Sequence, residues 1–219
     1  MPWWHEKRSD ASRGEATMSI VPPSARSGAR GGLAPLARRL HQAGITANTV
    51  TIAGLLVTAA GAALLAYGLP GAALVVLLVG SLADTLDGQI AKAAGGGTKL
   101  GAFLDSTFDR LSDAALTGAA LAYAAYHQDV LLFWSAFIAL VSGSLVPYIR
   151  AKAESLGLGA SVGLAPREAR LVLFLLGVAA WAVSANSSLF AAAVAAVALL
   201  STITVVQRLA HVAAALRNT

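Results

Sequence analysis

The chain has 219 residues, of which 57% are hydrophobic and only 12% are charged. Soluble domains carry about 25% charged residues, so this composition indicates a membrane protein and excludes a large soluble domain. Cysteine is absent, which excludes a disulfide framework and cysteine-based metal or nucleophile chemistry. The formal net charge of +5 is compatible with nucleic-acid binding or with the basic flanks of membrane helices.

The N-terminal segment 1–32 is polar and rich in Gly, Ser, Pro and Arg. This composition predicts a disordered cytoplasmic leader. The segment lacks the apolar core of a signal peptide, and Met18 is an alternative start of the chain. In residues 33–41, three leucines recur at helical spacing while two arginines point elsewhere. That pattern predicts a short interfacial helix lying on the membrane, with an ordinary cytosolic flank as the alternative.

Six apolar stretches follow, each close to the roughly 20 residues that a membrane-crossing helix needs. We therefore predict an all-α, polytopic membrane domain of six transmembrane helices over residues 33–210, followed by a cytoplasmic tail at 211–219. The six stretches are 48–68, 71–91, 101–124, 130–150, 168–185 and 187–209.

The basic residues indicate the orientation of these helices. The sixteen lysines and arginines lie before the first stretch, around the connections between stretches 2 and 3 and between 4 and 5, or at the C-terminal end. The other connections hold none. Because cytoplasmic loops carry the excess of Lys and Arg, we predict a multi-pass protein of the cell membrane with both termini cytoplasmic. This topology accounts for the basic charge, so no nucleic-acid partner is expected.

Two pairs of aspartates stand out in the second and third stretches. Asp84 and Asp87 are three residues apart, and Asp105 and Asp109 are four apart. On helices, both spacings place the two carboxylates of a pair on one face. A short Gly-rich turn joins the two stretches, so we expect antiparallel neighbouring helices whose aspartates converge near the cytoplasmic side.

Ionised aspartate within a membrane span costs about 2.5–3.5 kcal/mol on insertion scales, so the clustered carboxylates need compensation. A hard divalent cation is the expected source, because Mg²⁺ prefers carboxylate oxygens. No His or Cys lies near the cluster, which argues against zinc. The alternative is a set of buried ion pairs with Lys92, Lys99 and Arg110, but three bases do not balance five acids once Asp113 is counted.

The spacing of the residues in this region is a more specific indicator of function than their charge. It reads Asp84-x2-Asp87-Gly88-x2-Ala91-Lys92-x8-Gly101-x3-Asp105-x3-Asp109. This resembles the CDP-alcohol phosphatidyltransferase family, whose pattern is D-x2-D-G-x2-A-R-x8-G-x3-D-x3-D, at seven of eight fixed positions. The departure is Lys92, where the family usually has Arg; lysine lacks the bidentate fork that suits a diphosphate.

The resemblance implies a CDP-linked lipid, usually CDP-diacylglycerol, as donor: an alcohol oxygen attacks the phosphorus attached to the lipid, and CMP leaves. By residue-for-residue carry-over, Asp109 would be a metal ligand and the catalytic base. Two Mg²⁺ or Mn²⁺ ions are expected. The implied metal ligands are Asp84, Asp87, Asp105 and Asp109, and the implied donor-nucleotide site consists of Thr51, Asp84, Gly88, Ala91, Lys92 and Gly101. Asp113 lies outside the pattern, and we expect a structural role for it.

From about residue 45 to residue 208, the chain also resembles the actinobacterial phosphatidylinositol phosphate synthases, a subgroup of this family. That resemblance implies inositol phosphate as acceptor, and a homodimer. Arginine suits bidentate recognition of phosphate; the alternative is that the basic residues only anchor helix ends. The implied acceptor-phosphate pocket contains Arg150, Lys152, Arg167, Arg170 and Arg208.

Two other functions remain open at this stage. Within the family, glycerol phosphate or phosphatidylglycerol as acceptor would define a phosphatidylglycerophosphate or cardiolipin synthase. In another class, a cation transporter could also carry aspartates in its second and third spans, although transporters place such residues near the bilayer midplane on discontinuous helices.

Overall fold

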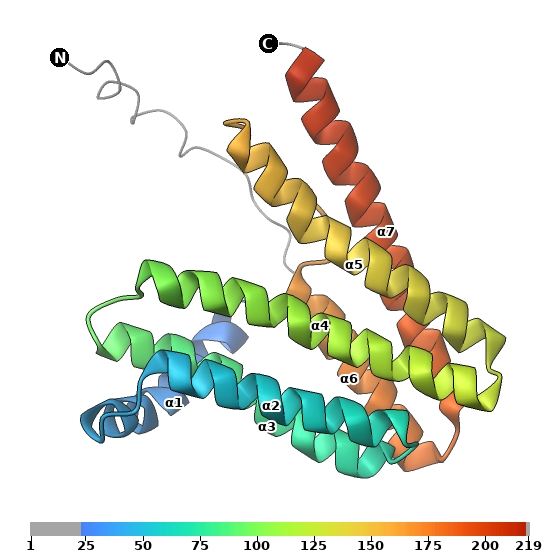
Figure 1. Ribbon diagram of the computed structural model, residues 1–219, viewed down its shortest axis with the longest axis horizontal. Coiled ribbons are helices and arrows are strands. Elements are labelled where there is room, and N and C mark those ends of the chain that lie inside the picture. Colours follow the sequence, from blue (N-terminus) through green and yellow to red (C-terminus); the bar gives the residue numbers. More distant parts are fainter. Residues whose placement is uncertain (1–22, 218–219) are drawn as a thin grey trace.

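The computed structural model describes residues 23–217, with side chains from residue 33 onward. All regular structure in this range is helical, so the all-α prediction is confirmed, and each of the six apolar stretches forms one helix (Figure 1). The helices are α1 (Pro23–Gln42), α2 (Ala47–Ala66), α3 (Pro70–Ala93), α4 (Lys99–His127), α5 (Val130–Ser155), α6 (Arg167–Ser184) and α7 (Ser187–Arg217).

Four of these helices, α2, α3, α5 and α7, are long and apolar enough to cross a membrane. Helices α4 and α6 do not meet the same criterion, so six spans are not established by length and composition. The reason is local: both helices carry several charged residues in the half that faces the candidate site described below, and these charges lower their hydropathy.

The first helix differs from its prediction in extent. Helix α1 begins at Pro23, so it extends into the segment 1–32 for which we predicted disorder; residues 1–22 lie outside the described part. Proline is well tolerated in a first helical turn. Helix α1 packs against α3, and Ala37 is buried. At the other end, α7 continues to Arg217, so the predicted tail 211–219 is helical over most of its length.

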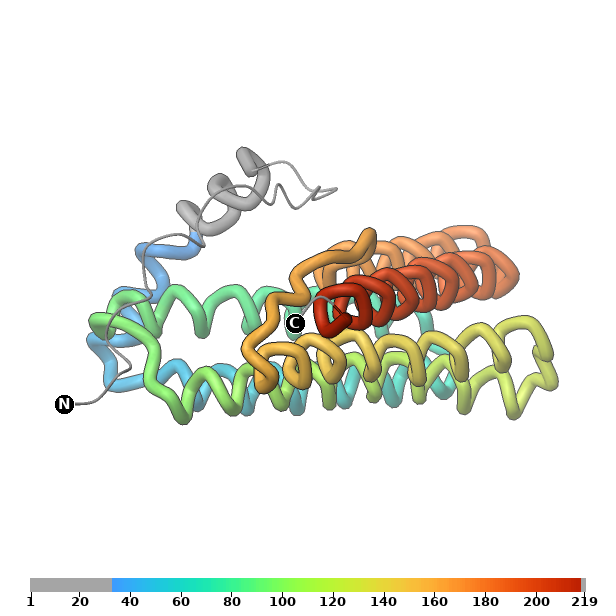
Figure 2. Tube along the Cα trace, turned by 90° about the horizontal axis from the view of Figure 1, so that it is seen from above, coloured from blue at the N-terminus to red at the C-terminus, as the bar shows by residue number. Residues whose placement is uncertain are grey.

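The six helices after α1 form two layers of three (Figure 2). Helices α2, α4 and α5 make one layer, and α3, α6 and α7 make the other. The principal contacts across the layers are α2 with α3 and α5 with α7. Because each short connection reverses the chain, the starts of α2, α4 and α6 and the ends of α3, α5 and α7 lie at the same end of the bundle.

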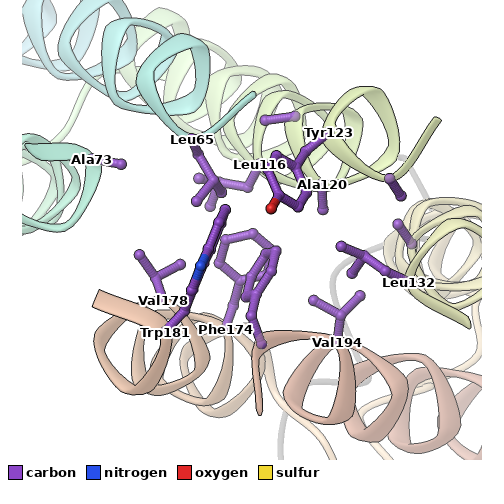
Figure 3. Close-up of a cluster of buried hydrophobic side chains, with 14 of the residues drawn as sticks. Leu65, Ala73, Leu116, Ala120, Tyr123, Leu132, Phe174, Val178, Trp181 and Val194 are labelled. Atoms are coloured by element: carbon purple, nitrogen blue, oxygen red, sulfur yellow. The ribbon is translucent and has the colours of Figure 1, made fainter. Parts of the chain in front are cut away.

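A cluster of buried apolar side chains joins the six helices at the opposite end (Figure 3). The ring of Trp181 is central, with its centroid 4.6 Å from that of Tyr123 and 5.5 Å from that of Phe190. Tight packing here fixes the helices at one end. Toward the other end, where the aspartates of α3 and α4 lie, α5 and α7 diverge from the other helices (Figure 1). Each helix contributes to the cluster, among others through Leu65, Ala73, Tyr123, Leu132, Trp181 and Val194.

Glycines allow α2 and α3 to approach closely. A Cβ added to Gly61 would lie 2.7 Å from Leu77 Cδ2, and one added to Gly80 would lie 2.6 Å from Thr58 Oγ1. Small residues at such contacts let two helix backbones pack together in a membrane. This contact sets the position of the aspartates of α3 relative to α2.

We expect Gly61→Ala to destabilise the protein, because overpacking a tight contact costs about 1–3 kcal/mol. Gly118→Ala is the matched control, because a Cβ there meets nothing within 4 Å and alanine is the better helix former. The measurement is the thermal unfolding midpoint of the purified protein in detergent. A midpoint for Gly61→Ala equal to or above that of Gly118→Ala would contradict the role of this contact.

Candidate metal centre and phosphate cavity

Three aspartates meet at the charged end of the bundle. One carboxylate oxygen from each of Asp84, Asp105 and Asp109 lies within 4.8 Å of the other two. Asp84 belongs to α3 and the other two to α4, so one aspartate of the first pair converges with both aspartates of the second. Oxygens this close suit a single divalent cation, and these three residues therefore fit the metal that the sequence implied.

The route by which α3 and α4 converge differs from the expectation. Helix α3 packs mainly against α1, α2 and α6, while α4 packs mainly against α2 and α5, so the two are not direct neighbours along their length. The connection 94–98 contains two glycines in the left-handed region, Gly95 (φ 92°) and Gly96 (φ 129°). A connection of this length lets α2 lie against both helices and leaves space between the aspartates.

The fourth aspartate of the motif is placed differently. Asp87 is only 5% exposed, and its Oδ2 accepts a hydrogen bond of 2.7 Å from the hydroxyl of Thr51 on α2. It is not part of the three-oxygen group. Thr51, which we predicted to contact the donor nucleotide, thus contacts a predicted metal ligand, and no local sequence pattern indicates this pairing.

The cation that balances the cluster comes from a distant part of the chain. Arg167, the first residue of α6, places Nη1 2.8 Å from Asp109 Oδ1 and 3.4 Å from Asp84 Oδ2. Within the described residues, neither Lys92 nor Lys99 forms an ion pair with the aspartates, and Arg110 donates to the carbonyl of Ser106 on its own helix. Ion pairing by the three nearby bases, the alternative considered from the sequence, is therefore not what the structure shows.

Asp113 joins the same network one turn further along α4. Its Oδ1 lies 3.2 Å from Arg167 Nε, and its Oδ2 lies 3.5 Å from Arg170 Nη2. The sequence contained a signal for this position, because Asp105, Asp109 and Asp113 follow one another at intervals of four residues and so share a helix face.

A cavity of about 790 Å³ adjoins the aspartate cluster. Its lining combines carboxylates, mainly from α3 and α4, with guanidinium groups, mainly from α5, α6 and α7; Arg110 of α4 and Glu168 of α6 line it as well. Of the predicted site residues, the cavity is lined by Asp84, Gly88, Lys92, Asp105, Asp109, Arg150, Arg167, Arg170 and Arg208. It therefore brings together most of the predicted metal ligands and four of the five predicted acceptor residues.

The remaining predicted residues lie outside this lining: Thr51, Asp87, Ala91, Gly101 and Lys152. Lys152 is exposed. The two motif glycines also differ from each other. A Cβ on Gly88 would meet nothing within 4 Å, so this position leaves open space beside the cavity, whereas a Cβ on Gly101 would lie 3.3 Å from Asn48 Oδ1 of α2. Gly101 therefore also allows the close approach of α4 to α2.

Arg208 links α7 to two other elements. Its Nε donates to the carbonyl of Val162 at 2.9 Å, and its Nη1 donates to the carbonyl of Val146 at 2.6 Å. The side chain is buried, 9% exposed. These contacts hold the α5–α6 connection against α7, and that connection forms one wall of the cavity.

The same connection is held by a tight glycine contact. Gly163 has φ of 144°, and an added Cβ would lie 2.5 Å from Thr204 Cγ2. The next two amides donate to α7: Leu164 to Gln207 Oε1 at 3.2 Å, and Ala165 to Thr204 Oγ1 at 3.3 Å.

We expect Gly163→Ala to loosen this wall, because a side chain in that backbone region costs of order 1–3 kcal/mol. The amides of Leu164 and Ala165 should exchange hydrogen for deuterium roughly tenfold faster, as measured by exchange mass spectrometry. Gly159→Ala is the control, because its Cβ meets nothing within 4 Å and its φ is not positive. Unchanged exchange in Gly163→Ala would show that the contact does not hold the connection.

Comparison with known proteins agrees with this geometry. The family model for CDP-alcohol phosphatidyltransferase matches residues 44–206. The chain belongs to the CDP-alcohol phosphatidyltransferase family. Among its curated relatives, the phosphatidylinositol phosphate synthase of Mycobacterium marinum is 42% identical over 147 residues, covering 65% of this chain and 62% of that protein. The Mycobacterium bovis protein of the same name is 40% identical over 145 residues, covering 65% of this chain and 67% of that protein.

Solved structures of phosphatidylinositol phosphate synthase from Mycobacterium tuberculosis are similar over more of their length. The structure with CDP-DAG bound has a TM-score of 0.77 at 36% identity, covering 82% of this chain and 92% of that chain. The structure in complex with manganese and citrate has the same TM-score and identity, and the match covers 82% of this chain and 88% of that chain.

Removing one carboxylate of the three-oxygen group should weaken metal binding. We expect Asp105→Asn to raise the dissociation constant for Mn²⁺ roughly tenfold or more, because hard cations are held by charged oxygen ligands. Paramagnetic resonance titration of free Mn²⁺ measures this. Asp129→Asn is the control, since this residue caps α5 at the far end of the bundle and asparagine caps helices equally well. Equal Mn²⁺ affinity in both variants would exclude Asp105 as a ligand.

Proposed function

We propose that the protein transfers a phosphatidyl group from CDP-diacylglycerol to inositol phosphate, giving phosphatidylinositol phosphate and CMP. The observation that carries the proposal is the cavity of about 790 Å³, whose lining includes the three aspartates of the candidate metal group and five arginines. Such a site suits two phosphate-bearing substrates, one beside a metal centre and the other beside guanidinium groups. The similarity to phosphatidylinositol phosphate synthases supports the choice of acceptor.

The donor would be held at the aspartate end of the cavity. Two Mg²⁺ or Mn²⁺ ions held there would neutralise the diphosphate and orient its oxygens. Three of the four predicted ligands already lie together, and the hydrogen bond from Thr51 holds the fourth, Asp87, in a fixed orientation. The residues proposed to contact the metal are Asp84, Asp87, Asp105 and Asp109, and those proposed to contact the donor nucleotide are Thr51, Asp84, Gly88, Ala91, Lys92 and Gly101.

The transfer needs one bond to form and one to break. The acceptor hydroxyl oxygen would bond to the phosphorus that carries the diacylglycerol, and the bond from that phosphorus to the bridging oxygen would break, so that CMP leaves with the electron pair. Asp109, which lines the cavity, would take the hydroxyl proton. Positioning of the two substrates supplies the larger part of the rate in such transfers.

The acceptor phosphate would be held by four of the arginines that line the cavity: Arg150, Arg167, Arg170 and Arg208. Two of them belong to the first turn of α6, where the helix dipole also favours an anion. Lys152, which lies outside the cavity lining, would contribute only a more distant positive charge. Arg150 pairs with Glu154 at 2.8 Å on an exposed surface, and such pairs exchange readily for a better anion.

We further propose that all six helices α2–α7 cross the cell membrane, with both termini cytoplasmic, and that the protein is a homodimer. Support for six spans comes from the two-layer bundle, in which α4 and α6 lie among the four apolar helices. The cytoplasmic orientation is supported by the basic residues, which gather at the end of the bundle where the cavity lies. The dimer rests on the family resemblance alone.

CMP release by the purified protein tests the proposed function. The assay contains CDP-diacylglycerol and Mg²⁺ with one acceptor at a time: inositol phosphate, inositol, glycerol phosphate or phosphatidylglycerol. We expect release that depends on inositol phosphate, and a loss of roughly 10²-fold or more in Asp109→Asn, the usual size for removing a general base. Release with glycerol phosphate or phosphatidylglycerol alone would replace the acceptor and keep the reaction. A folded, metal-binding protein that releases no CMP with any acceptor would exclude the enzyme and favour cation transport.

A further inference from the structure

Asp113 has a position that the proposed reaction does not explain. It belongs to the same face of α4 as Asp105 and Asp109 but is not part of the three-oxygen group. Its two carboxylate oxygens instead contact two different arginines, Oδ1 with Arg167 Nε and Oδ2 with Arg170 Nη2. One carboxylate thus bridges two guanidinium groups that lie one turn apart on α6.

Arg170 depends on this carboxylate more than an ordinary surface arginine would. The residue is only 8% exposed, and its Nη1 has no hydrogen-bond partner among the described residues. It lines a small cavity of about 50 Å³ between α4, α5, α6 and α7, together with Ser201. Within residues 33–217, Asp113 is the only carboxylate that forms an ion pair with it. A buried charge without a partner is strongly unfavourable, so Asp113 fixes where Arg170 lies.

Arg167 is oriented by the same contact. Its Nε lies against Asp113, while Nη1 of the same planar group reaches Asp109 and Asp84. Because the guanidinium is rigid and flat, fixing the Nε edge also fixes the direction of the terminal nitrogens, toward the junction between the aspartate cluster and the large cavity. Without a negative group between them, the two guanidinium groups would also repel each other.

We propose that Asp113 is a positioning residue for the acceptor: it sets the geometry of the Arg167–Arg170 pair that holds the acceptor phosphate, without itself contacting substrate or metal. The inference rests on the proposed function. It separates Asp113 from the neighbouring aspartates of α4, whose proposed partner is the metal.

The test variant is Asp113→Asn, which keeps the size of the side chain and removes its charge. Electrostatics alone predicts tighter phosphate binding, because a negative charge near the phosphate is lost. A positioning role predicts the opposite, and we expect the KM for inositol phosphate to rise roughly tenfold, as for the loss of a hydrogen bond between charged groups. The KM for CDP-diacylglycerol and the Mn²⁺ dissociation constant, measured by paramagnetic resonance, should change less than about twofold. The shift in thermal unfolding midpoint caused by inositol phosphate should shrink in parallel.

Glu168→Gln is the matched control. Glu168 belongs to the same first turn of α6 as the two arginines, and it forms no ion pair among the described residues. The substitution removes one negative charge beside the cavity and should leave the KM for inositol phosphate unchanged or slightly lower. An equal rise in both variants would mean that the effect is not specific to the carboxylate that contacts the two arginines, and the proposal would fail.

Other outcomes also decide the question. An unchanged or lower acceptor KM in Asp113→Asn overturns the proposal, and a parallel loss of Mn²⁺ affinity assigns Asp113 to the metal centre instead. If Asp113→Asn does not fold, Asp113→Glu keeps the charge but shifts the carboxylate by one methylene; an unchanged acceptor KM in that folded variant contradicts positioning. The wild-type assay separates a failure of the proposed function from a failure of the role of Asp113. If the wild-type protein does not transfer to inositol phosphate, the proposed acceptor is rejected. A fully active wild type with an unaffected Asp113→Asn rejects only the role of Asp113.

Discussion

Mutual repulsion among carboxylates governs the charged end of this protein. Asp84, Asp105, Asp109 and Asp113 come from α3 and α4, and three of them, Asp84, Asp109 and Asp113, form ion pairs with one cation, Arg167. Such a group is stable at the end of a membrane bundle only when cations balance it. The arginines of α6 supply part of this balance and the implied metal would supply the rest, so α6 must lie against α3 and α4 for the site to exist.

The bundle meets this requirement because one end is packed and apolar and the other end holds the open, charged cavity. Around Trp181, all six helices are joined by apolar packing, which holds α6 in register with its neighbours. At the other end, α5 and α7 diverge, and the space between them and the aspartates becomes the cavity. The connection between α5 and α6, held by Arg208 and Thr204, completes the wall. Rigid packing at one end therefore permits an open polar site at the other.

Three motif positions acquire distinct physical roles in this arrangement. Gly101 allows α4 to start close to α2, whereas Gly88 leaves space beside the cavity. Lys92, where the family usually has arginine, is exposed and lines the cavity with a flexible ammonium group. A point charge of this kind can follow a phosphate without fixing its orientation, and the orienting role then falls on the guanidinium groups across the cavity.

Apolar length and aspartate spacing determined most of the helices and the convergence of Asp84, Asp105 and Asp109, because both are local properties of a helix. Hydropathy could not establish α4 and α6 as spans, since the charges that build the site also lower their apolar character. The separate place of Asp87, bound by Thr51, and the bridging of Asp113 to Arg167 and Arg170 were decided by tertiary structure alone. These contacts join residues that are 36 to 57 positions apart in the chain. Spacing within one helix specifies which side chains share a face, but only the packing of α2 and α6 against α3 and α4 specifies which partner each carboxylate meets.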